Sequence, residues 1–66
     1  MPREIRQLIG DLEEAGFRQV SGGKGSHRKF RHRCFAGAVI LSGKASDDAQ
    51  RYQAKQVLRA IHEASQ

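Results

Sequence analysis

The small size of the chain limits its fold to one compact unit. A sequence of 66 residues supplies one domain and no more, and folding at this length removes only about 60% of the exposable surface from water. The hydrophobic core must therefore be small, and a deep cleft for a large cofactor is not expected. We predict a single domain over residues 1–66 that uses no cofactor.

Cysteine content and hydropathy narrow the class of protein. The one cysteine, Cys34, cannot form an intramolecular disulfide, and no CxxC motif or Cys/His zinc spacing is present, so no metal site is predicted. The N-terminal segment MPREIRQLIG lacks the continuous apolar run of a signal peptide. No segment approaches the roughly 18 apolar residues that span a bilayer. We expect a cytoplasmic protein that does not bind membranes.

Charge is distributed unevenly along the chain. The net charge is +5, yet all seven Asp and Glu residues lie outside residues 15–46, a stretch that holds seven Lys and Arg residues. A basic centre between near-neutral ends predicts one strongly positive surface and a polyanionic partner. A surface that serves only solubility would instead intersperse charges of both signs.

The first part of the chain predicts a helix followed by a strand. Residues 3–15 carry apolar side chains at the i, i+3, i+4, i+7 spacing of one helix face, formed by Ile5, Leu8, Ile9 and Leu12. Gly16 suits the left-handed position just past a helix end. Residues 17–21 are expected to form a short strand. Glycines at positions 22, 23 and 25 then predict a turn over residues 22–26.

Residues 27–34 are expected to form a second strand with two different faces, because strand side chains alternate with a period of two. One face should consist of Arg28, Phe30, His32 and Cys34. The other should consist of His27, Lys29, Arg31 and Arg33. The face with Phe30 is expected to contact the core, where Cys34 would be a small buried residue and His32 a structural histidine. A histidine then heads a row of three cations on the opposite face.

The second half of the chain predicts one more strand and one more helix. Residues 35–37 are expected to form a second turn, and residues 38–42 a short apolar strand. A helix should follow the loop at residues 43–46, with Ser46 or Asp47 as its N-cap. Its apolar stripe should consist of Ala54, Val57, Leu58, Ile61 and Ala64. The order α-β-β-β-α predicts an α+β fold with a three-stranded antiparallel sheet and two helices on one face.

This order of elements is that of the double-stranded-RNA-binding fold, and local motifs make the resemblance more specific. They are Ala15-Gly16-Phe17 after the first helix, Gly22-Gly23-Lys24 in the turn, and Gly25-Ser26-His27 at the start of the second strand, with Phe30 after it. Later motifs of the same kind are Leu41-Ser42-Gly43-Lys44, Asp47-Asp48-Ala49 and Tyr52-Gln53. On these motifs, which extend over about residues 3–63, the chain resembles the HicA toxins.

The resemblance implies an endoribonuclease that cleaves mRNA and blocks translation until a HicB-type antitoxin binds it. The catalytic histidine of the family corresponds to His27. Gly25 and Ser26 match the positions beside it, and we assign them positioning roles. The implied partners are single-stranded RNA and the antitoxin. The small size leads us to expect a monomer when the protein is free.

The residue types around His27 suit this chemistry on independent grounds. RNA is cleaved when its own 2′-OH attacks the adjacent phosphate, a route that needs proton transfer and charge stabilisation but neither a protein nucleophile nor a metal. Histidine exchanges protons near neutral pH, and a positioned acid or base contributes about 10²–10⁴ in rate. Candidate RNA-binding cations are Lys24, Arg28, Lys29, Arg31 and Arg33. The first three are nearest to His27 in the sequence, close enough to bind or neutralise the scissile phosphate.

Other reactive side chains have simpler explanations. His62, late in the second helix, suits the negative end of the helix dipole. Asp47 and Asp48 are explained by helix capping rather than by a metal site. Tyr52 is compatible with either a core position or a surface on which RNA bases stack.

Two other functions are compatible with a small basic domain. The first is a non-catalytic RNA-binding module with the same fold. Such modules place a lysine cluster at the start of the last helix, where it contacts the duplex, but Ser46-Asp47-Asp48-Ala49 has the opposite charge. The second is a basic protein that acts through an acidic protein partner. That function leaves the position of His27 unexplained.

Overall fold

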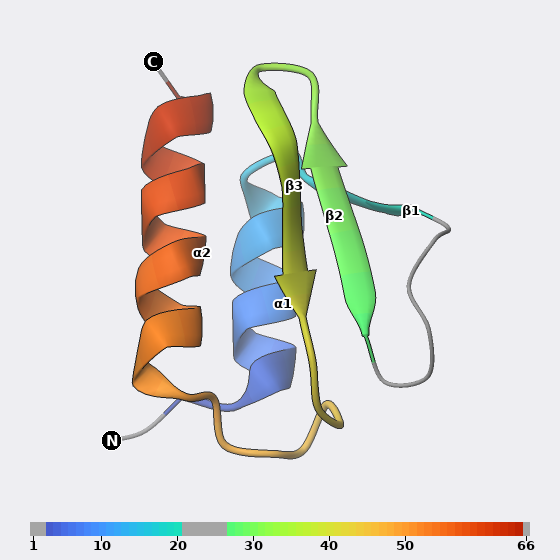
Figure 1. Ribbon diagram of the computed structural model, residues 1–66, viewed down its shortest axis with the longest axis vertical. Helices are drawn as coiled ribbons and strands as arrows, with labels where there is room; N and C mark the ends of the chain where they lie inside the picture. The colour runs from blue at the N-terminus through green and yellow to red at the C-terminus, as the bar shows by residue number, and fades with distance from the viewer. Residues whose placement is uncertain (1–2, 21–26, 66) are drawn as a thin grey trace.

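The computed structural model describes residues 3–20 and 27–65, and its elements follow the expected order. Helix α1 (Ile5–Glu14) precedes the strands β1 (Arg18–Val20), β2 (Arg28–His32) and β3 (Phe35–Leu41). Helix α2 (Arg51–Ala64) follows them. The strands form one antiparallel sheet in the order β1-β2-β3, so each pairs with its neighbour in sequence (Figure 1).

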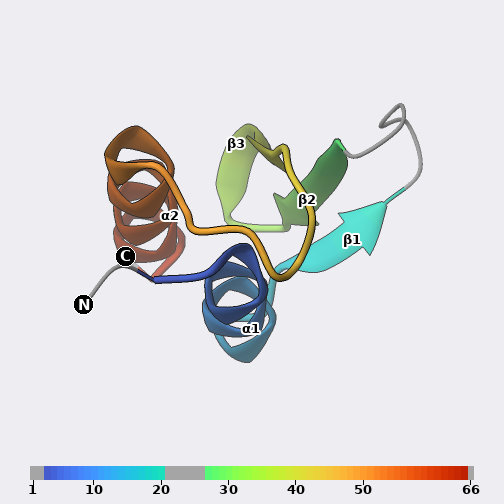
Figure 2. The ribbon, with the colours of Figure 1, turned by 90° about the horizontal axis from the view of Figure 1, so that it is seen from below.

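The two helices lie on the same side of the sheet (Figure 2). Between these layers is a small core of apolar side chains, in which Phe30 of β2 is 0% exposed. Around it pack Leu8, Leu12, Val39, Leu41 and Val57. The arrangement confirms the predicted α+β fold, and it gives the sheet an inner face toward the helices and an outer face away from them.

Helix α1 agrees with its sequence pattern. Ile5, Leu8 and Leu12 are buried, and the helix stops where Gly16 takes a left-handed φ of 98°. The backbone N–H of Phe17 then donates to the carbonyl of Leu12 at 2.9 Å, which satisfies one acceptor at the helix end. The chain therefore turns directly from α1 into β1.

The loop between β3 and α2 caps the start of α1. The backbone N–H groups of Ile5 and Arg6 donate to the carbonyls of Asp47 and Ala45, both at 2.9 Å. The Asp47 carboxylate in turn accepts the N–H of Lys44 at 2.9 Å. The expectation that Ser46 or Asp47 caps the second helix is therefore wrong, because this loop caps the N-terminus of the first helix instead.

Helix α2 begins at Arg51, with Gln50 as its N-cap. The N–H of Gln50 donates to the side-chain oxygen of Gln53 at 2.7 Å, and the amide of that buried side chain donates to the Ser42 carbonyl at 3.2 Å. The buried positions of the helix are Gln53, Val57, Ala60 and Ala64. Leu58, which was expected in the apolar stripe, is 67% exposed, because it lies about 100° around the helix from Val57.

The predicted second turn at residues 35–37 is also wrong. His32 pairs with Phe35, so the turn consists of Arg33 and Cys34, and β3 begins earlier than expected. Cys34 is consequently exposed rather than buried. The pairing shifts register between Phe30 and His32, and Gly37 takes a positive φ of 85° in the irregular part of β3.

Candidate functional site

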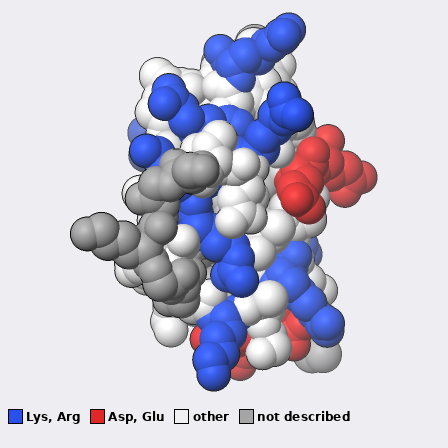
Figure 3. All heavy atoms as spheres, turned by 90° about the vertical axis from the view of Figure 1, so that its right-hand side faces the viewer, with Lys and Arg blue, Asp and Glu red and all other residues white. Residues whose placement is uncertain are grey.

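The outer face of the sheet carries the cations that the alternation of residues 27–34 predicts. Lys29 pairs with Val20 and with Ile40, and Arg31 pairs with Arg18, so these residues share one face. Phe30, between the two cations, is buried on the other. The placement of Lys29 and Arg31 opposite Phe30 is therefore as predicted. Figure 3, which views the molecule from the right of Figure 1, shows Lys and Arg side chains spread over this surface.

Arg28 does not belong to the outer face. It pairs with Leu41 and is half-buried, and its guanidinium donates to the Gly43 carbonyl at 2.9 Å. This contact joins the start of β2 to the loop after β3. Of the predicted RNA-binding cations, Arg28 is thus the one held by a hydrogen bond within the described part of the fold.

His27 lies immediately before β2 and is exposed. It makes no hydrogen bond with any of the residues at positions 3–20 and 27–65. Lys24, Gly25 and Ser26, which complete the predicted motif, lie outside the described residues. The imidazole of His27 is therefore accessible to a ligand at the end of the sheet where β2 begins.

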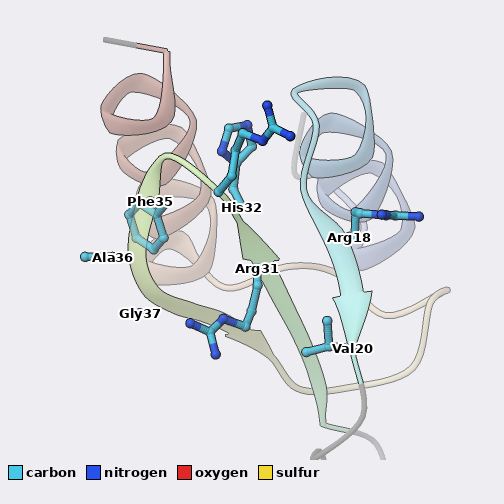
Figure 4. Close-up of a pocket in the computed structure, with 8 residues that line it drawn as sticks. Arg18, Val20, Arg31, His32, Phe35, Ala36 and Gly37 are labelled. Carbon is cyan, nitrogen blue, oxygen red and sulfur yellow. The ribbon is translucent and has the colours of Figure 1, made fainter.

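The opposite end of β2 contains a feature that the sequence pattern does not reveal. An open hollow of about 400 Å³ lies between β1, β2 and the start of β3 (Figure 4). Its cationic lining consists of Arg18, Arg31 and Arg33. Arg31 and Arg33 were predicted to bind RNA, whereas Arg18 is added by strand pairing, because its partner across β1 and β2 is Arg31.

His32 is fixed at the wall of this hollow. Its Nδ1 accepts the backbone N–H of Cys34 at 2.9 Å, and its ring centroid lies 4.9 Å from that of Phe17. A Cβ atom on Gly16 would lie 3.0 Å from its Nε2, so the ring is enclosed on that side as well. The expectation that His32 lies on the inner, core-facing side of β2 is confirmed.

The other candidate side chains, Tyr52 and His62, both belong to α2. Tyr52 is 64% exposed, which decides between its two expected positions in favour of the surface. His62 lies in the last turn of α2, as expected. Over residues 3–20 and 27–65, no three His, Cys, Asp or Glu side chains are grouped closely enough to hold a metal ion. Neither described helix is long and apolar enough to cross a membrane.

The chain matches a known protein family over most of its length. The family model for the HicA toxin of bacterial toxin–antitoxin systems matches residues 5–62, which is most of the chain. No curated protein and no solved structure matches the sequence or the fold. The family match extends from the first residue of α1 into the last turn of α2, so it includes every described strand of the sheet. The chain belongs to the HicA toxin family and is the toxin of a toxin–antitoxin pair, whose partner is an antitoxin.

Proposed function

We propose that this toxin is a metal-independent endoribonuclease that cleaves mRNA with His27 as its general acid/base and so blocks translation until the antitoxin binds. The observation that supports the proposal most directly is the position of His27. It is exposed, it precedes β2 directly, and it stands at the end of a row of outer-face cations that begins with Lys29.

The chemistry uses the substrate's own nucleophile. The 2′-oxygen of one ribose attacks the adjacent phosphorus, the P–O5′ bond breaks, and the products are a 2′,3′-cyclic phosphate and a free 5′-hydroxyl. The attacking hydroxyl loses a proton and the leaving oxygen gains one, so no oxidant or metal enters the balance. His27 transfers one of these protons, which contributes about 10²–10⁴ in rate.

The cations of β2 supply electrostatic stabilisation. Lys29 is two residues from His27, and its half-buried side chain lies on the outer face. Fixed positive charge next to a phosphate that becomes more negative in the transition state stabilises that state more than the ground state. Arg28 contributes by fixing the start of β2 against Gly43. We retain Lys24, Gly25 and Ser26 as RNA-binding or positioning residues on the strength of the motif.

The same surface suits an acidic antitoxin. Complementary charges increase the rate of association, and a protein that covers His27 and Lys29 would also exclude RNA. Inhibition by covering the basic face requires no change in the fold of the toxin.

The non-catalytic alternative would dock on duplex RNA through the start of α2. That segment has Gln50 as its cap and Arg51 as its first residue, and the exposed carboxylates of Asp47 and Asp48 come just before it. Negative charge at this place repels the phosphates that a duplex-binding module must contact. The composition of this segment favours the nuclease over the duplex-binding module.

Cleavage of a single-stranded RNA in the presence of EDTA tests the proposal. The wild-type toxin, separated from its antitoxin, should cleave the RNA, and His27→Ala should lower the rate by at least about 100-fold. His62→Ala, which removes another exposed histidine, is the matched control and should cleave normally. All three proteins should have the same circular dichroism spectrum and bind the RNA.

Three results would contradict the proposal. Cleavage by wild-type protein that disappears in EDTA and returns with Mg²⁺ would show that a metal is required. Cleavage at the same rate by wild-type protein and His27→Ala would exclude His27 as the proton carrier. Binding without cleavage, both in buffer and in a translating extract, would favour the RNA-binding module.

A further inference from the structure

We propose that the hollow lined by Arg18, Arg31 and Arg33 binds one nucleotide of the RNA strand, about two nucleotides from the phosphate that is cleaved. In this proposal Arg18 binds RNA, and the hollow is a subsite distinct from the site at His27. The inference rests on the proposed function, because His27 defines where the scissile phosphate lies.

Unbalanced charge is the first observation that carries the inference. Arg18 and Arg31 are direct cross-strand partners on the outer face, an arrangement in which like charges destabilise a sheet. Within the part of the chain that the structure describes, the ion pairs are Arg3–Asp11, Arg6–Glu4 and Arg59–Glu63, and none involves the hollow. The side chains of Arg18 and Arg31 diverge (Figure 4), which reduces their repulsion, and no carboxylate of the described residues is paired with either guanidinium group.

The apolar part of the lining is the second observation. Val20, Phe35 and Ala36 contribute to the hollow beside the arginines, and the ring of Phe35 is held 5.6 Å from that of Phe17. Gly37 has no side chain to fill the space, and a Cβ there would meet nothing within 4 Å. Cations combined with an apolar surface suit the phosphate and the base of a single-stranded nucleotide, since bases stack on aromatic rings and on arginine.

The size of the hollow agrees with a ligand of this kind. Its volume of about 400 Å³ lies toward the lower end of the range of small-molecule sites, which is about 300–1,000 Å³. His32 contributes a wall rather than a phosphate contact, because Nδ1 is occupied by Cys34 and Nε2 faces Gly16. Recognition of the phosphate is thus left to the three arginines.

The register of β2 connects this subsite to His27. Successive outer-face residues on a strand are about 6.6 Å apart, which is close to the separation of neighbouring phosphates in an extended single strand. Arg31 is four residues beyond His27, which lies immediately before β2, so about 13 Å of extended chain would separate the two. An extended RNA that places its scissile phosphate at His27 would pass Lys29 and reach the hollow about two phosphates later.

Binding of uncleavable 2′-O-methyl RNA strands of two, four and six nucleotides, measured by fluorescence anisotropy, tests the proposal. For the wild-type toxin the affinity should rise from the two- to the six-nucleotide strand. Arg18→Ala should weaken binding of the six-nucleotide strand about fivefold to tenfold and lower its salt slope by about 0.7, the value for one lost phosphate contact. Binding of the dinucleotide should not change.

A matched control and a modified probe complete the experiment. Arg59→Ala removes the same charge from the exposed surface of α2 and should leave the salt slope of the six-nucleotide strand unchanged. A six-nucleotide strand without its base at one end or the other should bind the wild-type toxin about tenfold more weakly in one of the two cases, because one base no longer stacks.

Each outcome decides a separate question. If Arg18→Ala binds every length as the wild type does, the subsite is wrong, and the dependence of cleavage on His27 is decided separately by the His27→Ala experiment. If both abasic strands bind as well as the intact one, the hollow does not hold a base. A wild-type protein that binds no RNA of any length would contradict the proposed function itself.

Discussion

The two faces of the sheet contrast sharply, although their residues alternate along the same strand. On the inner face Phe30 is fully buried among apolar side chains, and Arg28 donates its hydrogen bond to Gly43. On the outer face Arg18 and Arg31 stand opposite each other with no carboxylate among the described residues to balance them. The inner face is satisfied within the fold, whereas the described residues provide no counter-charge for the outer face, which an RNA phosphate would supply under the proposed function. Under the proposed function, stability and RNA binding thus depend on alternate residues of β2.

Phe30→Ala should give the largest effect on stability. Loss of a fully buried phenylalanine costs about 3–5 kcal/mol, a large part of the stability of a small domain. Urea denaturation followed by circular dichroism should show a protein that is largely unfolded or has a much lower midpoint. Lys29→Ala, one residue away on the outer face, should change the free energy of unfolding by less than about 0.5 kcal/mol. Equal destabilisation by both substitutions would remove the contrast between the faces.

Gly16→Ala should have an intermediate effect. Gly16 has a φ of 98°, and an added Cβ would lie 3.0 Å from Nε2 of His32. A left-handed non-glycine residue costs about 1–2 kcal/mol before any contact with the imidazole. Gly10→Ala is the matched control, because it lies inside α1 with nothing within 4 Å of its Cβ, and alanine favours a helix. The urea midpoint should be lower for Gly16→Ala than for the wild type, and equal or higher for Gly10→Ala. The reverse order would show that the junction of α1 and β1 is not held in this conformation.

Arg31→Gln should have the smallest effect on stability, and its sign is opposite. Removal of one of two opposed cations should raise the free energy of unfolding by up to about 0.5 kcal/mol at low salt. The gain should vanish near 1 M salt, where the screening length is about 3 Å. A loss of stability at low salt would mean that the arginine side chain contributes more through packing than it costs through repulsion.

Much of the fold could be predicted from periodicity. The buried positions Ile5, Leu8 and Leu12 follow helical spacing, and the opposition of Phe30 to Lys29 and Arg31 follows strand spacing. The predictions failed where short-range contacts determine the position of a turn. Cys34 is exposed because His32 pairs with Phe35 and closes a two-residue turn, which alternation alone does not mark.

The site was predicted only in part, for a similar reason. The motif and the row of cations predict His27 and Arg31 on one strand, whereas β2 begins at Arg28 and His27 lies immediately before it. The contribution of Arg18 depends on which residue of β1 faces which residue of β2, and that register is set by a turn and by packing rather than by composition. The Gly43 contact of Arg28 likewise depends on a loop fifteen residues further along the chain.

The capping of α1 by the distant loop affects how the chain acquires its structure during synthesis. The first N–H groups of α1 find their acceptors only when Ala45 and Asp47 have been made, and the inner face is covered only when Val57 and Ala60 arrive. Contacts that span forty residues form late because the intervening chain must first be ordered. The growing polypeptide therefore cannot complete the native core and the capping of α1 before residues 45–60 have been synthesised.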